Sequence, residues 1–172
     1  MDVVDAFRML FETLPILHHV DAVVWDVDET LGAAPGWESG PLARYVHRPA
    51  DLRRVLRWLK SKGIVSTMVS RNLAFCDSDL TGSSREARAL GFDHVHRCSR
   101  RMLDRSKADL AAEQLNISPR KMLLIDDNTA ECMAACDSGA VSLCCRHGPA
   151  LPSLRTAKFE IYIPTSGGPR RL

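Results

Sequence analysis

The sequence has no long apolar run, no strong excess of charge and no low-complexity block before its last residues. No stretch is apolar over enough residues to span a bilayer. The N-terminus carries early acidic residues and lacks a basic start, so it does not predict a signal peptide. The net charge is +2 and the basic residues are spread along the chain, a pattern that gives no support for nucleic-acid binding. We therefore expect a cytoplasmic protein with no membrane partner.

The cysteines lack the CxxC pairing of structural zinc sites, and no GxxxxGK[ST] run is present to indicate a P-loop. The six cysteines are Cys76, Cys98, Cys132, Cys136, Cys144 and Cys145. Because nothing indicates export, we expect them to be reduced thiols. Cys132 and Cys136 are one helical turn apart, and His94, His96 and Cys98 alternate along the chain. A zinc site built from them is less favoured than burial of the cysteines as small apolar residues.

Length and composition indicate one water-soluble domain with its own core. The chain has 172 residues, of which 45% are hydrophobic and 26% are charged. That mixture is typical of globular proteins and too apolar for general disorder. We expect a helical extension over residues 1–19, a main catalytic domain over 20–163 and a loose tail over 164–172.

Apolar periodicity predicts helices alternating with short buried strands. The predicted helices are 3–14, 50–62, 83–90, 106–115 and 129–138. The predicted strands are 20–25, 64–69, 93–97, 122–125 and 140–144. This alternation is typical of an α/β fold, so we expect a three-layer, Rossmann-like, doubly wound sheet of about five mostly parallel strands.

Acidic residues follow two of the predicted strands directly. Asp26 and Asp28 come after the run at 20–25, and Asp126 and Asp127 come after the run at 122–125. Carboxyl ends of parallel strands meet at one edge of the sheet, where four carboxylates would repel one another strongly without a cation. An all-oxygen site suits Mg²⁺, which is often completed by phosphate oxygens of a substrate. The sequence therefore predicts a magnesium site at which an anion also binds.

The same residue types support phosphoryl transfer. An ionised Asp26 beside a metal ion is the better candidate for a nucleophile that attacks phosphorus. The side chain of Asp28, two positions later on the strand, points in a direction similar to that of Asp26. It is therefore suited to protonate the leaving oxygen and then deprotonate water. Ser70 could donate a hydrogen bond to a phosphoryl oxygen, and Lys107 could neutralise charge in the transition state.

These residues resemble the four ordered motifs of the haloacid dehalogenase superfamily of aspartate-nucleophile phosphotransferases. The segments that resemble these motifs are, in order, "DVDET" with Asp26 and Asp28, Ser70 after its apolar strand, Lys107, and the acidic pair in "LLIDDN". The resemblance spans residues 20–145. The resemblance implies that Asp26, the main-chain carbonyl of Asp28 and the pair Asp126/Asp127 ligate Mg²⁺, with the direct ligand of that pair left open. It also implies that Thr30 steadies the turn after Asp26.

Members of this superfamily often carry a cap domain, but the intervals between motifs here are too short for one. We therefore expect a capless enzyme whose phosphorylated substrates include macromolecular or carrier-bound ones. "SRN" and "SK" resemble the small magnesium-dependent phosphatases of the superfamily. Arg71 and Asn72 are the candidate substrate-binding residues, with turn formation as the alternative, and Trp37, His47 and Arg48 are weaker candidates.

Four other functions are open to a chain with these residues. A phosphotransferase would use the same aspartyl-phosphate and differ only in the acceptor. A glyceryl-processing enzyme is disfavoured because Val69 stands where those domains often carry a cysteine. A response-regulator receiver is disfavoured because Lys107 precedes the acidic pair instead of following it. A catalytically silent scaffold is disfavoured because none of the costly charges is missing.

Overall fold

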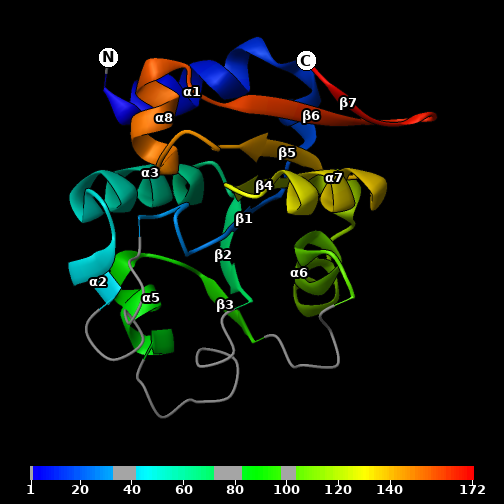
Figure 1. The fold of residues 1–172 in the computed structure, drawn as a ribbon. Coiled ribbons are helices and arrows are strands. Elements are labelled where there is room, and N and C mark those ends of the chain that lie inside the picture. Colours follow the sequence, from blue (N-terminus) through cyan, green and yellow to red (C-terminus); the bar gives the residue numbers. More distant parts are fainter. Residues whose placement is uncertain (1, 33–41, 72–82, 98–103) are drawn as a thin grey trace.

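The computed structural model describes residues 2–32, 42–71, 83–97 and 104–172 (Figure 1). The helices are α1 (Val3–Thr13), α2 (Leu42–Tyr45), α3 (Pro49–Ser61), α5 (Ser83–Leu90), α6 (Lys107–Leu115), α7 (Thr129–Asp137) and α8 (Ala150–Thr156). The strands are β1 (Ala22–Trp25), β2 (Val65–Ser70), β3 (His94–Arg97), β4 (Met122–Asp126), β5 (Val141–Cys144), β6 (Glu160–Thr165) and β7 (Gly168–Arg171). Short 3-10 helices occupy Pro15–His19 and Pro119–Lys121. None of the helices in the described ranges combines the length and the apolar character that crossing a membrane requires.

The strands form one sheet in the order β3-β2-β1-β4-β5-β6-β7. The first five strands in chain order pair in parallel, and β6 and β7 pair antiparallel at one edge. The order reverses direction at β1, because β2 lies on one side of it and β4 on the other. The predicted doubly wound, mostly parallel α/β sheet is therefore confirmed, and its binding crevice is expected at the carboxyl ends of β1 and β4.

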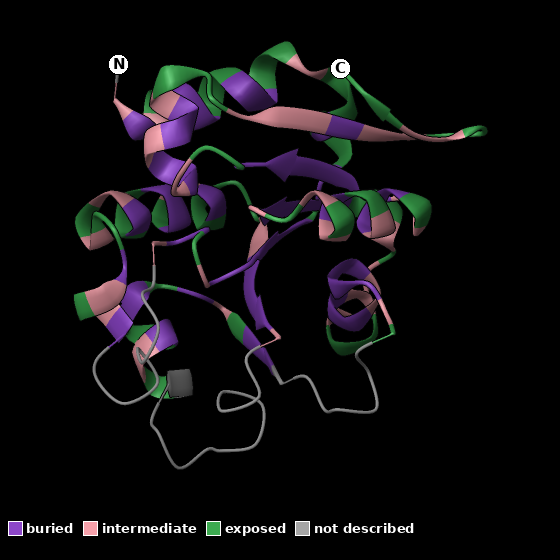
Figure 2. Cartoon of the chain, in the orientation of Figure 1, coloured by how far each residue is buried: buried purple, intermediate pink, exposed green. Residues whose placement is uncertain are grey.

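Alternating side chains of β1 enter two separate cores, which makes the fold three-layered. Val23 and Trp25 belong to a large core under α1, α3, α5 and α8, whereas Ala22 and Val24 belong to a smaller core under α6 and α7. Figure 1 shows these two helical layers on opposite sides of the sheet, and Figure 2 shows the central strands buried throughout. Strands covered on both faces are typical of parallel sheets and explain the continuous apolar runs in the sequence.

Helix α1 packs into the main core and is not a separate appendage. Asp2 caps the helix, since its carboxylate accepts a hydrogen bond from the backbone N–H of Val4 at 2.8 Å. The ring of Phe7 stacks on Trp25 of β1 with centroids 5.7 Å apart and meets the edge of Trp58 of α3 at 6.2 Å. The predicted helical extension over 1–19 therefore shares its core with the strands.

The predicted count of about five strands is too low, and the loose tail predicted over 164–172 is wrong. Residues Glu160–Arg171 form a β-hairpin that extends the sheet by two strands. Pro164 pairs with Pro169 across the hairpin, and Gly168 adopts a φ of 105° at the turn. Prolines and glycines indicate loops in a sequence, yet both are tolerated at a sheet edge, where a ladder hydrogen bond is not required.

Candidate active site

Strand β1 carries Asp26 to the edge of the core. All four residues of the strand are fully buried, as its apolar, β-branched sequence dictates. The backbone N–H of Asp26 donates to the carbonyl oxygen of Ile125 at 3.0 Å, so the chain is still bonded to β4 at this point. Asp26 itself is only 5% exposed. Its carboxylate therefore lies in a low-dielectric environment at the carboxyl end of the sheet.

Strand β4 places Asp126 beside Asp26. The parallel register pairs Trp25 with Ile125, so the next residue along each strand is an aspartate. Asp126 is fully buried, and its Oδ1 accepts a hydrogen bond from the backbone N–H of Asn128 at 2.8 Å. The two strand ends identified from the sequence thus meet at one point.

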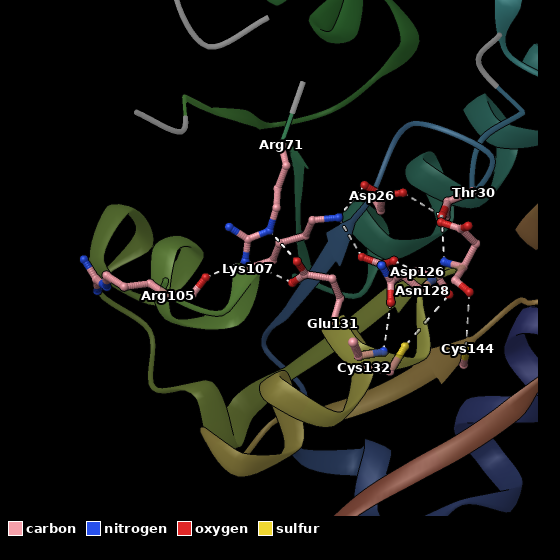
Figure 3. Close-up of polar contacts among 12 residues, drawn as sticks. Asp26, Thr30, Arg71, Arg105, Lys107, Asp126, Asn128, Glu131, Cys132 and Cys144 are labelled. Carbon is pink, nitrogen blue, oxygen red and sulfur yellow. Dashed lines mark hydrogen bonds and ion pairs between the residues drawn. The ribbon is translucent and has the colours of Figure 1, made fainter. Parts of the chain in front are cut away.

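Lys107 links these two carboxylates. Its Nζ lies 2.5 Å from Oδ1 of Asp26 and 2.7 Å from Oδ2 of Asp126 (Figure 3). The lysine side chain is only 5% exposed, so the ammonium group has exchanged most of its water for the two carboxylates. A buried ammonium group needs such partners, because an unpaired charge in the interior is strongly unfavourable.

The first turn of α6 fixes the position of Lys107. Ser106 caps the helix, and its Oγ accepts a hydrogen bond from the backbone N–H of Asp109 at 3.0 Å. The carboxylate of Asp109 accepts hydrogen bonds from Ser106 and from Ser138, which lies at the end of α7, each at 2.7 Å. The start of α6 is therefore tied to α7, which keeps the lysine aimed at the strand ends.

Thr30 joins Asp26 to the second residue of the acidic pair. Its Oγ1 donates to Oδ2 of Asp26 at 2.8 Å and accepts from the backbone N–H of Asp127 at 2.9 Å. The turn that brings Thr30 back toward the strand passes through Glu29, which has a left-handed φ of 62°. Thr30 is fully buried. It therefore fixes the orientation of the Asp26 carboxylate and links the turn to Asp127.

Burial and their mutual contacts shift the pKa values of Asp26, Asp126 and Lys107. Burial raises the pKa of Asp26, against the opposing effect of Lys107 and Thr30. Burial and the nearby Asp26 carboxylate raise the pKa of Asp126 to about 7, although Lys107 opposes this. Burial alone would lower the pKa of Lys107, but the two carboxylates outweigh it and raise that pKa above its ordinary value. The lysine stays charged, and the carboxylates gain from any further cation.

Three carboxylates converge closely enough to hold a metal ion. One oxygen each from Asp26, Asp126 and Asp127 lies within 4.8 Å of the others. Carboxylate oxygens are hard ligands, and a set that leaves several positions for water or phosphate fits Mg²⁺. Lys107 neutralises one of the three negative charges, so a divalent cation would balance the remaining two. The donor set therefore fits the predicted metal.

The carboxylate of Asp28 is not among these three. Asp28 follows the fully buried Val27 and is itself half-buried at the start of the turn through Glu29. This arrangement leaves its side chain outside the three-carboxylate cluster, which is compatible with a ligand role for its main-chain carbonyl. Its assignment as acid/base and as carbonyl ligand stays a prediction.

Ser70 ends β2 and is fully buried, and Arg71 follows it directly. The guanidinium of Arg71 donates to both carboxylate oxygens of Glu131 and to the carbonyl oxygen of Arg105 (Figure 3). The predicted substrate-binding residue Asn72 lies outside the described residues, as does Trp37. The roles predicted for Ser70 and Arg71 in substrate binding remain predictions.

Nothing in the sequence indicates that Arg71 contacts Glu131 and Arg105. Glu131 lies in the first turn of α7, where an acidic residue is common because it favours the positive end of the helix dipole. Because Glu131 has this local explanation, its presence does not indicate an ion pair with Arg71, which is 60 positions away in the chain. Arg105 contributes only its backbone carbonyl, which no side-chain pattern could indicate.

Buried thiols lie directly behind the acidic pair. Cys132 Sγ is 3.9 Å from the carbonyl oxygen of Asp126, and Cys144 Sγ is 3.6 Å from that of Asp127. The four cysteines in the described ranges are free and buried, and Cys76 and Cys98 lie outside those ranges. Among the described residues, no group of three or more potential metal ligands includes a cysteine or a histidine. Cys132, Cys136 and Cys144 pack with Tyr162 in a buried apolar cluster, which is typical of cysteine as a small apolar residue.

No protein-family model matches the chain, and neither does any curated protein sequence. Solved structures do resemble it at low identity. The cobalt-bound deoxy-D-mannose-octulosonate 8-phosphate phosphatase from Haemophilus influenzae is 15% identical with a TM-score of 0.53, over 80% of this chain and 75% of that chain. An uncharacterized protein from Corynebacterium glutamicum is also 15% identical with a TM-score of 0.53, over 72% of this chain and 82% of its own.

A third structure is the 3-deoxy-D-manno-octulosonate 8-phosphate phosphatase from Moraxella catarrhalis in complex with magnesium, phosphate and KDO. It is 16% identical, covers 75% of this chain and 69% of its own, and has a TM-score of 0.47. The first two similarities extend over most of each chain, so they show a shared fold. The chain therefore shares the fold of the H. influenzae phosphatase and the C. glutamicum protein.

Proposed function

We propose that this protein is a magnesium-dependent phosphatase that hydrolyses a phosphomonoester through an aspartyl-phosphate formed on Asp26. The observation that carries this proposal is the meeting of Asp26, Lys107, Asp126 and Asp127 at one point, although three distant parts of the chain supply them. Such a cluster would be unstable as a purely structural feature, because buried like charges repel. It becomes favourable when a divalent cation and a phosphate group are bound.

Asp26, Asp126 and Asp127 would hold the metal ion, together with the main-chain carbonyl of Asp28. Bound there, a divalent cation neutralises the carboxylates and polarises a phosphoryl oxygen. The cobalt in the H. influenzae phosphatase of the same fold supports a divalent ion in this type of protein. Mg²⁺ is the proposed ion, since the three converging ligands are all carboxylates.

In the first half-reaction, a carboxylate oxygen of Asp26 bonds to phosphorus and the bond from phosphorus to the leaving oxygen breaks. Thr30 and Lys107 each hold one oxygen of Asp26, so the carboxylate cannot rotate freely. Orientation of this kind removes much of the entropic cost of the attack. Asp28 gives its proton to the leaving oxygen, so an alcohol departs and Asp28 becomes ionised.

In the second half-reaction, the ionised Asp28 takes a proton from water as the water oxygen bonds to phosphorus. The bond between phosphorus and Asp26 then breaks, which releases phosphate and restores both aspartates. Throughout, Lys107 and the hydroxyl of Ser70 would offset the negative charge on the phosphoryl oxygens. Each residue thus keeps the role that its place in the sequence motifs indicated.

The short intervals between the motif residues support a proposal about the substrate class. In the interval between Thr30 and Ser70, the described residues, which exclude 33–41, form α2, α3 and β2. In the interval between Ser70 and Lys107, the described residues, which exclude 72–82 and 98–103, form α5 and β3. Neither interval leaves the ~50 residues that a separate domain needs. We therefore include phosphoproteins and carrier-bound phosphate esters among the substrates, alongside small esters.

The proposal is tested by measuring phosphate release from a generic aryl phosphate with Mg²⁺. We expect Asp26→Asn to abolish turnover, because an amide is a poor nucleophile, and EDTA to do the same in the wild type. The matched control is Asp137→Asn, an exposed aspartate at the far end of α7, which should leave turnover unchanged.

A silent scaffold would behave differently in two respects. Its phosphate release would not change with Asp26→Asn, and beryllofluoride with Mg²⁺ would not raise its melting temperature. An active phosphatase should be stabilised by beryllofluoride, because this ion mimics the phosphoryl group on an aspartate. A substrate screen with phosphopeptides, sugar phosphates and carrier-bound esters then identifies the leaving group.

A further inference from the structure

The side chain of Arg71 joins three segments that surround the proposed active site. Its Nε and Nη2 donate to the two carboxylate oxygens of Glu131, the Nη2 contact measuring 3.1 Å. Nη2 also donates to the carbonyl oxygen of Arg105. Figure 3 shows this guanidinium between the loop before α6 and the first turn of α7. One arginine at the end of β2 therefore contacts the segments that carry Lys107 and the acidic pair.

The two partners of Arg71 lie close in sequence to the reacting groups. Arg105 is two residues before Lys107, and Glu131 is five residues after Asp126. A contact that restrains the Arg105 carbonyl also restrains the backbone that carries Lys107. A contact that restrains Glu131 also restrains the first turn of α7, which begins two residues after Asp127.

This contact is stronger than an ordinary surface ion pair. The side chains of Arg71 and Glu131 are 23% and 15% exposed, so most of the interaction is shielded from water. A guanidinium that meets both oxygens of a carboxylate forms a bidentate pair with fixed geometry, whereas exposed single contacts contribute little. The carbonyl of Arg105 adds a third acceptor. The guanidinium therefore has a defined orientation without a bound substrate.

We infer that Arg71 is a positioning residue that, with Glu131, holds Lys107 in place between Asp26 and Asp126. This inference rests on the proposed phosphatase function, and it assigns Arg71 a role different from substrate binding. Lys107 must keep contacts of 2.5 and 2.7 Å to two carboxylates at once. Displacement of a catalytic group by about 1 Å can lower a rate by about 100-fold, so the restraint on its backbone affects turnover directly.

The first test separates kcat from KM in Arg71→Ala, Glu131→Ala and the double variant. We expect each single variant to lower kcat by about ten- to 100-fold with KM unchanged within about twofold. The kcat of the double variant should be no lower than that of the more impaired single variant, because both changes break the same contact. Glu131→Gln keeps an acceptor oxygen and should retain part of the kcat lost in Glu131→Ala.

A substrate-binding arginine would give the opposite pattern. Arg71→Ala would then raise KM, and Glu131→Ala would leave kcat intact because it frees the arginine for the substrate. That result overturns the inference while leaving the phosphatase proposal in place. Arg71→Lys supplies a charge without the planar fork, so it should resemble Arg71→Ala in kcat if positioning is the role.

A second readout does not depend on turnover. We expect the amine of Lys107, buried and paired in the wild type, to be acylated by an amine-reactive ester at least tenfold faster in Arg71→Lys and Glu131→Gln. Lys60, whose side chain is 73% exposed, serves as the reference amine in the same sample. The control is Asp21→Asn, which breaks the exposed pair between Asp21 and Lys121 and should leave Lys107 unreactive.

The two readouts distinguish the two possible failures. If the wild type releases no phosphate but the Arg71 and Glu131 variants expose Lys107, the phosphatase proposal fails and the positioning contact stands. If the wild type is active and the folded conservative variants change neither kcat nor the acylation rate of Lys107, the positioning role is refuted.

Discussion

At the scale of single residues, Lys107 connects the folding of this protein with its proposed chemistry. Its ammonium group is almost completely removed from water and contacts Asp26 and Asp126 directly. A structural role alone would be served better by apolar residues, since buried ion pairs contribute little net stability. The cluster is therefore consistent with the proposed binding of a metal ion and a phosphate group, which would offset the charge of the carboxylates.

Lys107→Met should test this connection, because it removes the charge and keeps most of the side-chain volume. In EDTA at pH 7.5 we expect the free energy of unfolding to fall by about 3–5 kcal/mol, since two buried carboxylates lose their counter-charge. Mg²⁺ should restore part of this loss but not the turnover. The measurement is urea denaturation with and without Mg²⁺, combined with the aryl phosphate assay.

The matched control for this change is Lys121→Met. Lys121 pairs with Asp21 at the opposite end of the sheet and is 56% exposed, so the loss of stability should stay below about 1 kcal/mol. Equal losses from both substitutions would contradict the view that Lys107 compensates buried charge.

Residue types and their order along the chain predicted the central part of this site, but not its support. Asp26 and Asp126 could be placed because each directly follows an apolar strand, and parallel strand ends meet. The pair of Arg71 with Glu131 could not be placed, because each residue has an ordinary local explanation. Only the fold shows that these two side chains meet.

At the scale of elements, α1 shows how a segment outside the sequence motifs takes part in the core. Phe7 is fully buried between Trp25 of the central strand, Phe11 of the same helix and Trp58 of α3. Trp25 immediately precedes Asp26, so the aromatic cluster also supports the strand end that carries the proposed nucleophile. The helix is therefore a structural part of the domain that contains the acidic cluster.

Phe7→Ala should lower the free energy of unfolding by about 3–5 kcal/mol, because a large buried ring leaves a cavity. Met9→Ala is the control on the same helix, since Met9 is 47% exposed and its truncation should change stability by at most about 0.5 kcal/mol. Urea denaturation measures both. A small loss with Phe7→Ala would instead indicate that α1 is a detachable extension.

The elements that the sequence predicted well share strong periodicity and clear end signals. Helix α6 begins after the Ser106 cap and ends before Asn116, which adopts the left-handed conformation, in agreement with the predicted range 106–115. The hairpin of β6 and β7 was missed, because Pro164, Pro169 and the glycines between them indicate a loop. Its pairing with β5 depends on contacts across the sheet, which local patterns do not contain.

At the scale of the whole molecule, the sheet order brings acids from distant segments to one edge. The binding of a cation there is coupled to folding, because the cluster does not exist in the unfolded chain. A ligand present at 100 times its dissociation constant adds about 2.7 kcal/mol to the free energy of unfolding. The acidic cluster should therefore make global stability depend on both pH and Mg²⁺.

The direction of the pH dependence follows from Asp126. Its pKa in the folded protein is raised to about 7, whereas an unfolded aspartate has a pKa of about 3.9. Between these values the folded state binds more protons than the unfolded state, so stability falls as pH rises. The contribution is fully present below about pH 4 and is lost as pH passes about 7, with a slope of up to about 1.4 kcal/mol per pH unit.

We therefore expect metal-free protein to lose stability between pH 5 and 8 relative to Asp126→Asn, which cannot titrate at this position. The comparison with the variant matters because burial lowers the pKa of His96, which makes stability rise with pH in part of the same range. Mg²⁺ binds the ionised carboxylates, so it should remove the decline in the wild type and have little effect on the variant. The measurement is urea denaturation across this pH range in EDTA and in Mg²⁺. If the stability of metal-free wild type relative to Asp126→Asn instead stays constant between pH 5 and 8, Asp126 is already ionised below pH 5 and a cation would not be needed to keep it so.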